Sequence, residues 1–164
     1  MADEPPDECY AQVILTVLDC APLLARPRLA RLTARTLRDC ASVAPGRLWG
    51  YVVLPEAVRL VVGPTADDAL AAFVDEIKAR TGKQLLEAIL RASDDETLDM
   101  VLRYTPVWGG AIYRVWTPGY HRHVFWTEYK LSNALYEMLQ APVEAGLVER
   151  AEQWPYTWVN EDDS

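Results

Sequence analysis

The sequence predicts an α+β protein on the ferredoxin-like split βαβ plan, with an antiparallel sheet, helices packed on one face, and a C-terminal helix and tail. The first observation is the order of patterns: strand, helix, strand, strand, helix, strand. The second is that Pro55-Glu56 alone separates two apolar runs, which indicates a hairpin. The third is composition, since 51% apolar and 24% charged residues are ordinary values for a folded domain.

The first part of the chain supplies a strand, a helix and the hairpin. Residues 10–18 are rich in Val, Ile, Leu and Thr, which is typical of a buried strand. Apolar positions recur at helical spacing from 28 to 42, and Pro45-Gly46 ends that helix with a turn. The hairpin strands are expected over 48–54 and 57–62, and Gly63-Pro64 closes the pair.

The second part supplies three helices, one extended segment and a tail. Helices are expected over 67–90, over 93–103 behind the capping box Ser93-Asp94-Asp95-Glu96, and over 127–140, just before Pro142. Trp108-Gly109-Gly110 is predicted to be a turn, and residues 111–116 a strand or extended segment. The aromatic and basic stretch 116–126 fits no single pattern. The tail over 143–159 is expected to pack through Trp154, Tyr156 and Trp158.

Bulk properties indicate one domain over residues 1–164 in a reducing cytoplasm. The net charge is −8, but seven carboxylates lie in the acidic tails, 1–8 and 160–164, and removing them from −8 leaves −1. The tails are expected to be flexible. Three scattered cysteines make a disulfide framework or zinc site improbable. The acidic start is unlike a signal peptide, and no apolar run is long enough to cross a membrane.

Several segments match one known pattern when they are taken together. They are Tyr51-Val52-Val53-Leu54-Pro55-Glu56, Trp116-Thr117-Pro118-Gly119-Tyr120, His123-Val124, Pro142-Val143-Glu144-Ala145-Gly146-Leu147-Val148 and Trp154-Pro155-Tyr156. At this mutual spacing the chain resembles the single-tyrosine transposases of the HUH class, and most of all the REP-associated tyrosine transposases. The resemblance implies the split βαβ fold, Mg²⁺ or Mn²⁺ as cofactor, DNA strand cleavage and joining through a phosphotyrosine, and hairpin or single-stranded DNA as partner.

The chain departs from that family at each catalytic position. The family's two metal-binding histidines correspond to Ala57 and Arg59, and its nucleophilic tyrosine to Glu137, five residues before Pro142. Ala57 has no ligand atom, and Arg59 brings a permanent positive charge that repels a cation yet can grip a phosphate with two hydrogen bonds. Tyr136 is one residue away, which rotates it by about 100° around a helix. The sequence therefore predicts a domesticated protein with no metal and no intact nucleophile.

Basic residues fall into two groups of candidates for DNA binding. Arg28, Arg31, Arg35 and Arg38 share one face of the first predicted helix, and the rest are Arg59, Arg114, His121, Arg122, His123 and Lys130. A solvated helix face is the alternative for the four arginines, since charge runs usually face water. His121 and His123 can converge on one side of a strand, but the sequence offers no evident third metal ligand. The aromatic residues Tyr113, Trp116, Tyr120, Phe125 and Trp126 can stack on bases or belong to the core.

Three functions remain open at this point. The first is a transposase-like protein that binds hairpin or single-stranded DNA without cutting it. The second is an active enzyme with a rearranged site that uses Tyr136 or Tyr129, with Glu56, Glu137 or His123 as ligands. The third is a protein-interaction module that has kept only the fold, which the acidic balance favours. A homodimer is compatible with each of them.

Overall fold

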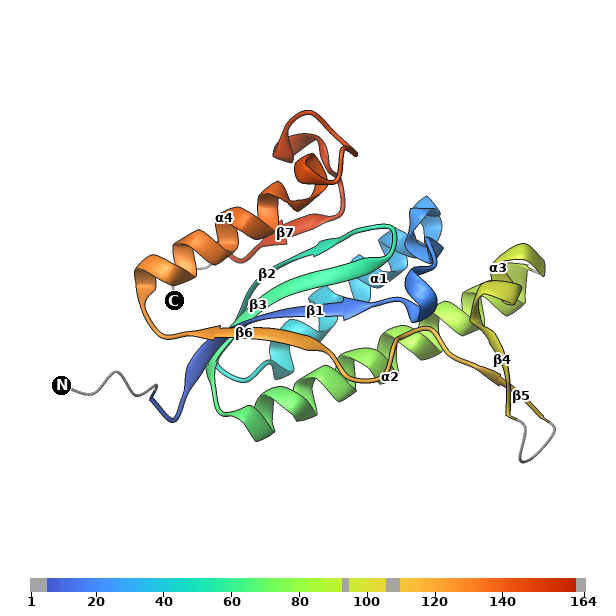
Figure 1. The fold of residues 1–164 in the computed structure, drawn as a ribbon, viewed down its shortest axis with the longest axis horizontal. Helices are drawn as coiled ribbons and strands as arrows, with labels where there is room; N and C mark the ends of the chain where they lie inside the picture. The colour runs from blue at the N-terminus through green and yellow to red at the C-terminus, as the bar shows by residue number, and fades with distance from the viewer. Residues whose placement is uncertain (1–5, 93–94, 106–109, 162–164) are drawn as a thin grey trace.

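A five-stranded antiparallel sheet forms the centre of the computed structural model, which describes residues 6–92, 95–105 and 110–161 (Figure 1). Its strands stand in the order β6-β1-β3-β2-β7. Their bounds are Cys9–Thr16 for β1, Arg47–Val53 for β2, Ala57–Thr65 for β3, His121–Phe125 for β6 and Thr157–Val159 for β7. The first four strands have the neighbours that the split βαβ plan requires, and this confirms the predicted fold class.

Two long helices cover one face of this sheet. They are α1 (Pro27–Cys40) and α2 (Asp67–Ala92), and they follow β1 and β3 in the chain. In β1 every second residue, from Ala11 to Val17, is fully buried, as expected of a strand that turns one face to a core. Leu60 of β3 and Leu37 of α1 belong to the same apolar cluster. Burial of this alternating set therefore fixes which face the helices occupy.

A second, smaller core lies on the other face of the sheet. There α4 (Glu128–Glu144) packs Leu131 and Met138 in one cluster with Val52 of β2 and Val61 of β3. Leu60 and Val61 are consecutive and both fully buried, yet they belong to different cores. The sheet is thus enclosed on both sides near β2 and β3.

The strand that completes the split βαβ plan, next to β1, is not the one that the sequence predicts. Residues 111–116 overlap β5 (Gly110–Tyr113), which pairs only with β4 (Leu102–Thr105), in a separate two-stranded sheet beside α3 (Asp95–Val101). The partner of β1 is β6, from the stretch that fits no single pattern. Three of the five β6 residues are exposed, so its apolar alternation is too weak to identify it. The predicted turn at 108–110 lies largely outside the described residues, as do Ser93 and Asp94 of the capping box.

Two elements extend beyond the ends that the sequence predicts for them. The helix α4 does not stop before Pro142 but continues to Glu144, and β3 continues through Gly63 and Pro64 to Thr65, which pairs with Cys9. Proline removes one backbone donor from a helix. Pro142 is nevertheless buried beside Ala141, so packing against the sheet outweighs that local loss.

The C-terminal tail packs as predicted and adds a strand. The indole Nε1 of Trp154 donates to the Val53 carbonyl at 2.8 Å, and the Trp158 ring lies 5.6 Å from that of Tyr51. In β7, Trp158 pairs with Tyr51 of β2. The backbone N–H of Asn160, the first residue of the predicted flexible tail, donates to the Trp49 carbonyl at 2.9 Å. Residues 1–5 and 162–164 of the predicted tails lie outside the described part of the chain.

Four short 3-10 helices complete the described elements. They are η1 (Leu18–Cys20), η2 (Leu23–Ala25), η3 (Ala41–Val43) and η4 (Ala151–Gln153). Within the described residues, no helix combines the length and apolar character needed to cross a bilayer.

Candidate nucleic-acid interface

The part of the second sheet face that lies over β1, β3 and β6 holds the two positions, Ala57 and Arg59, at which the chain lacks the metal-binding histidines of the HUH pattern. Arg59 pairs with Ile14 on one side and Val52 on the other, and Ile14 pairs in turn with His121. Directly paired residues on neighbouring strands point to the same side of a sheet. A row across four strands therefore places Arg59 and His121 on one surface, with only Ile14 between them.

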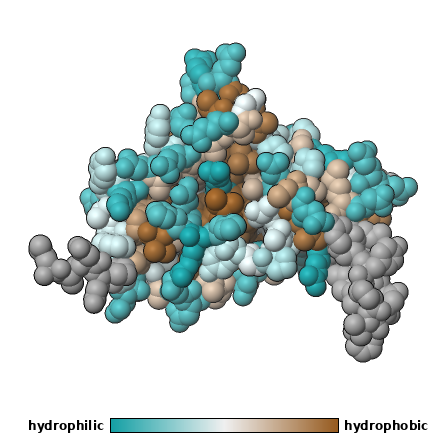
Figure 2. Space-filling model, in the orientation of Figure 1, coloured by the Kyte–Doolittle hydropathy of each residue, from teal (hydrophilic) through white to brown (hydrophobic). Residues whose placement is uncertain are grey.

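A second row runs beside the first one. His123 pairs with Gln12, which pairs with Val61, and the His123 ring lies 6.3 Å from that of Phe125, two residues along the same strand. Ala57 and Thr16 form the next pair beyond Arg59 and Ile14. We call the surface formed by these two rows and the Ala57–Thr16 pair the sheet face; its members are Gln12, Ile14, Thr16, Ala57, Arg59, His121 and His123. Figure 1 looks onto this side with α1 behind the strands, and Figure 2 shows hydrophilic and apolar groups intermingled over it.

Arg59 is the one sheet-face residue that carries a permanent charge. Its side chain is half-buried, and it forms no ion pair with any described residue. Ala57, in the neighbouring pair on the same side of the sheet, is only 9% exposed, so this part of the sheet face is partly enclosed. An arginine without a carboxylate partner on a partly enclosed surface is available to an external anion.

The donor set of the sheet face does not fit the divalent cation of the HUH class. Ala57 offers no ligand atom, and the guanidinium of Arg59 repels a metal ion. His121 and His123 do lie on one side of β6, but two imidazoles are fewer ligands than a stable site requires. Within the described residues, no three His, Cys, Asp or Glu side chains come together to form a metal site. We therefore derive no catalytic step through a metal.

Arg122 belongs to the opposite face of the sheet. It pairs with the buried Val13 and forms a hydrogen-bonded ion pair with Asp67 in the first turn of α2. That contact raises the pKa of Arg122 further above its usual value. Arg122 therefore links the edge strand to α2 and does not join the sheet face. Arg114 is exposed beyond β5, and Lys130 is exposed in the first turn of α4.

The residues proposed for strand cleavage lie along the exposed side of α4. Tyr129 and Tyr136 are 77% and 64% exposed, and their spacing of seven residues aligns them along the helix. Glu137 is also exposed and shares its stripe with Lys130, about 100° around the helix from Tyr136. Tyr136 is therefore turned away from the direction that the equivalent family position takes.

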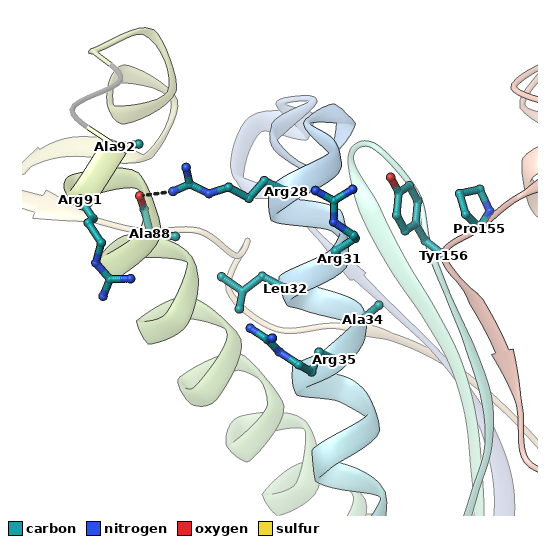
Figure 3. A pocket seen from close by; sticks show the side chains of 10 residues that line it. All are labelled: Arg28, Arg31, Leu32, Ala34, Arg35, Ala88, Arg91, Ala92, Pro155 and Tyr156. Carbon is teal, nitrogen blue, oxygen red and sulfur yellow. Dashed lines mark hydrogen bonds between the residues drawn. The ribbon is translucent and has the colours of Figure 1, made fainter.

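The four predicted arginines of α1 lie on the far side of the molecule from the sheet face. The guanidinium of Arg28 donates to the Ala88 carbonyl of α2 at 2.8 Å, and that of Arg38 lies 5.1 Å from the Trp158 ring centre. A groove of about 990 Å³ runs along α1. Its lining residues are Arg28, Arg31, Leu32, Ala34, Arg35, Ala88, Arg91, Ala92, Pro155 and Tyr156 (Figure 3). We call it the arginine groove. Sequence reasoning missed Arg91, because only the packing of α1 on α2 brings it there.

Most of the aromatic candidates are core residues. Phe125 and Trp116 are buried, and the Trp116 indole donates to the Thr81 hydroxyl at 2.8 Å. Tyr120 packs partly buried against the larger core, and Trp126 is 43% exposed. The Tyr113 side chain lies outside the described part of the structure. Of the four candidates whose side chains the structure describes, Trp126 is therefore the one with a largely exposed ring.

The architecture is a split βαβ sheet extended by α4 on its second face and by β7 at its edge. This is the fold of the transposases that the sequence resembles. A REP-associated tyrosine transposase, whose structure is bound to a REP hairpin, superposes with a TM-score of 0.63 at 17% identity, over 96% of this chain and 82% of that one. A provisionally assigned transposase from Deinococcus radiodurans R1 superposes with a TM-score of 0.51 at 19% identity, over 88% of this chain and 95% of that one.

These similarities establish the fold, and at such low identity they establish nothing finer. No known family profile matches the sequence, and no curated protein matches it either. The function must therefore be argued from the side chains of this chain.

Proposed function

We propose that the protein is a transposase-like DNA-binding protein that recognises a hairpin or single-stranded element and does not cut it. The observation that carries the proposal is the half-buried guanidinium of Arg59 on the sheet face, which has no ion-pair partner among residues 6–92, 95–105 and 110–161. It stands where the resembling family holds a metal, so the site has exchanged cation binding for anion binding. The phosphodiester is the anion that the transposase fold suggests.

Neighbouring groups extend this contact into a surface for a strand. His121 lies in the same cross-strand row as Arg59, and Gln12 and His123 form the adjacent row. Imidazole and amide groups donate hydrogen bonds to phosphate or sugar oxygens without a fixed sequence preference. Lys130, exposed at the start of α4, adds positive charge beside β6. Recognition by shape and backbone contacts follows from this set.

A gel-shift titration with a labelled hairpin oligonucleotide tests the proposal. We expect binding that weakens as salt rises, with the slope of log K against log salt reporting the phosphate contacts. Arg59→Gln should reduce affinity by about tenfold, because one charged contact is lost from a partly enclosed site. Lys83→Gln, at an exposed position on α2, removes the same charge elsewhere and should leave the affinity nearly unchanged. Indifference of the wild-type protein to DNA at low salt would remove the proposal.

The active-enzyme alternative is tested in the same preparation. Tyr129 and Tyr136 are exposed phenols, so attack on a phosphodiester would leave a covalent protein–DNA adduct. Incubation of the hairpin with Mg²⁺ or Mn²⁺, followed by denaturing electrophoresis, should show no adduct. An adduct that disappears in Tyr136→Phe would establish cleavage and overturn the inactive assignment.

The third alternative, a protein-interaction module in monomeric or homodimeric form, predicts a different result. It requires that neither the sheet face nor the arginine groove responds to DNA. Arg59 argues against it. Its half-buried charge has no ion-pair partner among the described residues, and partial burial of such a charge costs free energy that only a bound anion offsets.

A further inference from the structure

We propose that the arginine groove is a second nucleic-acid site, which takes a single strand on the side of the molecule opposite the sheet face. This inference rests on the proposed function, because it assumes that the protein binds DNA. It concerns different elements, since the groove is formed by α1, by the end of α2 and by the Pro155-Tyr156 segment.

The charge of the groove is the first argument. Arg28, Arg31, Arg35 and Arg91 line it, and none of its ten lining residues is acidic. Within the described residues none of these four arginines forms an ion pair, and Arg28 alone donates a hydrogen bond, to a backbone carbonyl. In a chain with 24 acidic and 16 basic residues, a groove with four cations and no carboxylate is a distinct anionic-ligand site.

The spacing of the arginines is the second argument. Arg28, Arg31 and Arg35 follow one another at about 4.5 and 6 Å along the axis of α1, from a rise of 1.5 Å per residue. Arg38 continues the series into an adjoining hollow lined by Tyr51 and Thr157. One free phosphate engages one or two such groups. A row of this length fits a ligand whose negative charge repeats, as the phosphates of a nucleic-acid strand do.

The apolar surface of the groove is the third argument, and it favours a single strand over a duplex. In Figure 3, Arg28 and Arg35 project over the space between α1 and α2, Arg91 extends along the side of α2 that faces away from α1, and Arg31 lies on the side of Tyr156. Leu32, Ala88 and the Tyr156 ring supply apolar surface between these charges. Bases reach such a surface only when they are unpaired, and arginines beside an aromatic ring suit a stacked base. A duplex is too wide to enter a groove between helices packed about 8–10 Å apart.

The test is fluorescence anisotropy with a labelled single strand of about 12 nucleotides, a length within the site sizes of single-strand binders. The double variant Arg31→Gln/Arg35→Gln should weaken binding by about tenfold and reduce the salt slope by about 0.7 for each arginine. Lys83→Gln is the control for charge, and circular dichroism confirms that the exposed substitutions leave the fold intact. Tyr156→Leu should weaken single-strand binding while leaving the salt slope unchanged, because it removes stacking and no charge.

The outcomes separate this inference from the proposed function. Hairpin binding that depends on Arg59, with single-strand affinity unaltered by the double variant, would overturn the groove and leave the proposed function standing. No binding to any DNA would remove both. Competition by polyglutamate at the same charge concentration as DNA would also overturn the inference, because it would identify an acidic peptide site. Preference for the single strand over duplex and polyglutamate, lost in the double variant, supports it.

Discussion

The sheet face and the arginine groove both present positive charge, but the first is built on strands and the second mainly on a helix. The sheet face assembles residues from three strands, so Arg59 and His121 meet only because β3 and β6 flank β1. The arginine groove rests mainly on one helix, where neighbouring arginines follow from the helical repeat. The first surface depends on the whole sheet, and the second on α1 and its packing. This difference predicts how each surface responds to damage.

The largest expected effect comes from loosening the edge strand of the sheet face. Phe125 is 2% exposed and stacks on Tyr10 with ring centres 5.8 Å apart. Phe125→Ala should lower the free energy of unfolding by about 3–5 kcal/mol, because it removes the ring that anchors β6 and leaves a cavity in its place. Urea denaturation measures this loss. Trp126→Ala, at the next and half-exposed position, is the control and should cost less than about 1 kcal/mol.

A similar comparison tests the place where α4 and β7 meet the sheet. A Cβ atom on Gly50 would lie 2.7 Å from the Trp158 carbonyl oxygen and 2.9 Å from the Met138 methyl carbon. Gly50→Ala should therefore destabilise the protein by about 1–3 kcal/mol, since the backbone of β7 must move. Gly82→Ala is the matched control, because nothing lies within 4 Å of its added carbon. Because Gly82 lies in a helix, Gly82→Ala should stabilise the protein by about 0.4–1 kcal/mol. Equal changes in the melting temperature of the two variants would contradict the close packing of Gly50 against β7 and α4.

Tyr51, in the hollow that adjoins the arginine groove, makes stability depend on pH. Burial raises the pKa of Tyr51, and the hydrogen bond and positive charge of Arg38 only partly oppose this. A raised pKa means that the folded state holds the proton more tightly than the unfolded state. The contribution of Tyr51 to the free energy of unfolding is complete below about pH 10, and it is lost as the pH rises through the pKa that Tyr51 has in the folded state. Wild type should lose stability faster than Tyr51→Phe above pH 10 in parallel urea titrations. Identical slopes would show that the phenol is solvated.

The smallest expected effect is the coupling between the two surfaces. Combining Arg59→Gln with Arg35→Gln should weaken binding of a hairpin with a single-stranded extension by the sum of the separate effects, within about 0.5 kcal/mol. The sheet and its helix layer, about 10 Å apart, separate the two side chains. A larger interaction energy in the double-mutant cycle would show that one strand spans both surfaces.

The same contrast explains what the sequence can predict. The stripe on α1 and the hairpin at Pro55-Glu56 depend on local spacing, so both are visible in the printed residues. The packing of Trp154 and Trp158 also follows from their size and apolar character. These features need no knowledge of distant contacts.

Features decided by tertiary packing are those that the sequence cannot supply. The strand β6 has exposed His121, Arg122 and His123 and only one fully buried residue, so it lacks a strand pattern. Burial of Ala141 and Pro142, the first of them in one cluster with Val52 and Val61, accompanies the continuation of α4 beyond the expected end. Arg91 enters the arginine groove through the contact of α1 with α2, which local spacing does not reveal. Only the register of β6 shows that Arg122 lies on the opposite face of the sheet from His121 and His123.

The pairing of β7 with β2 has a consequence for how the protein behaves at high concentration. An uncovered strand edge offers backbone groups to other molecules and can start aggregation. In the described sheet β7, of three residues, covers the edge of β2 and becomes the outer strand on that side, while β6 is the outer strand on the other. Three exposed polar residues on that short strand, two of them imidazoles, discourage the addition of a foreign strand. Two of these side chains, His121 and His123, belong to the sheet face and thus also help to keep the protein dispersed.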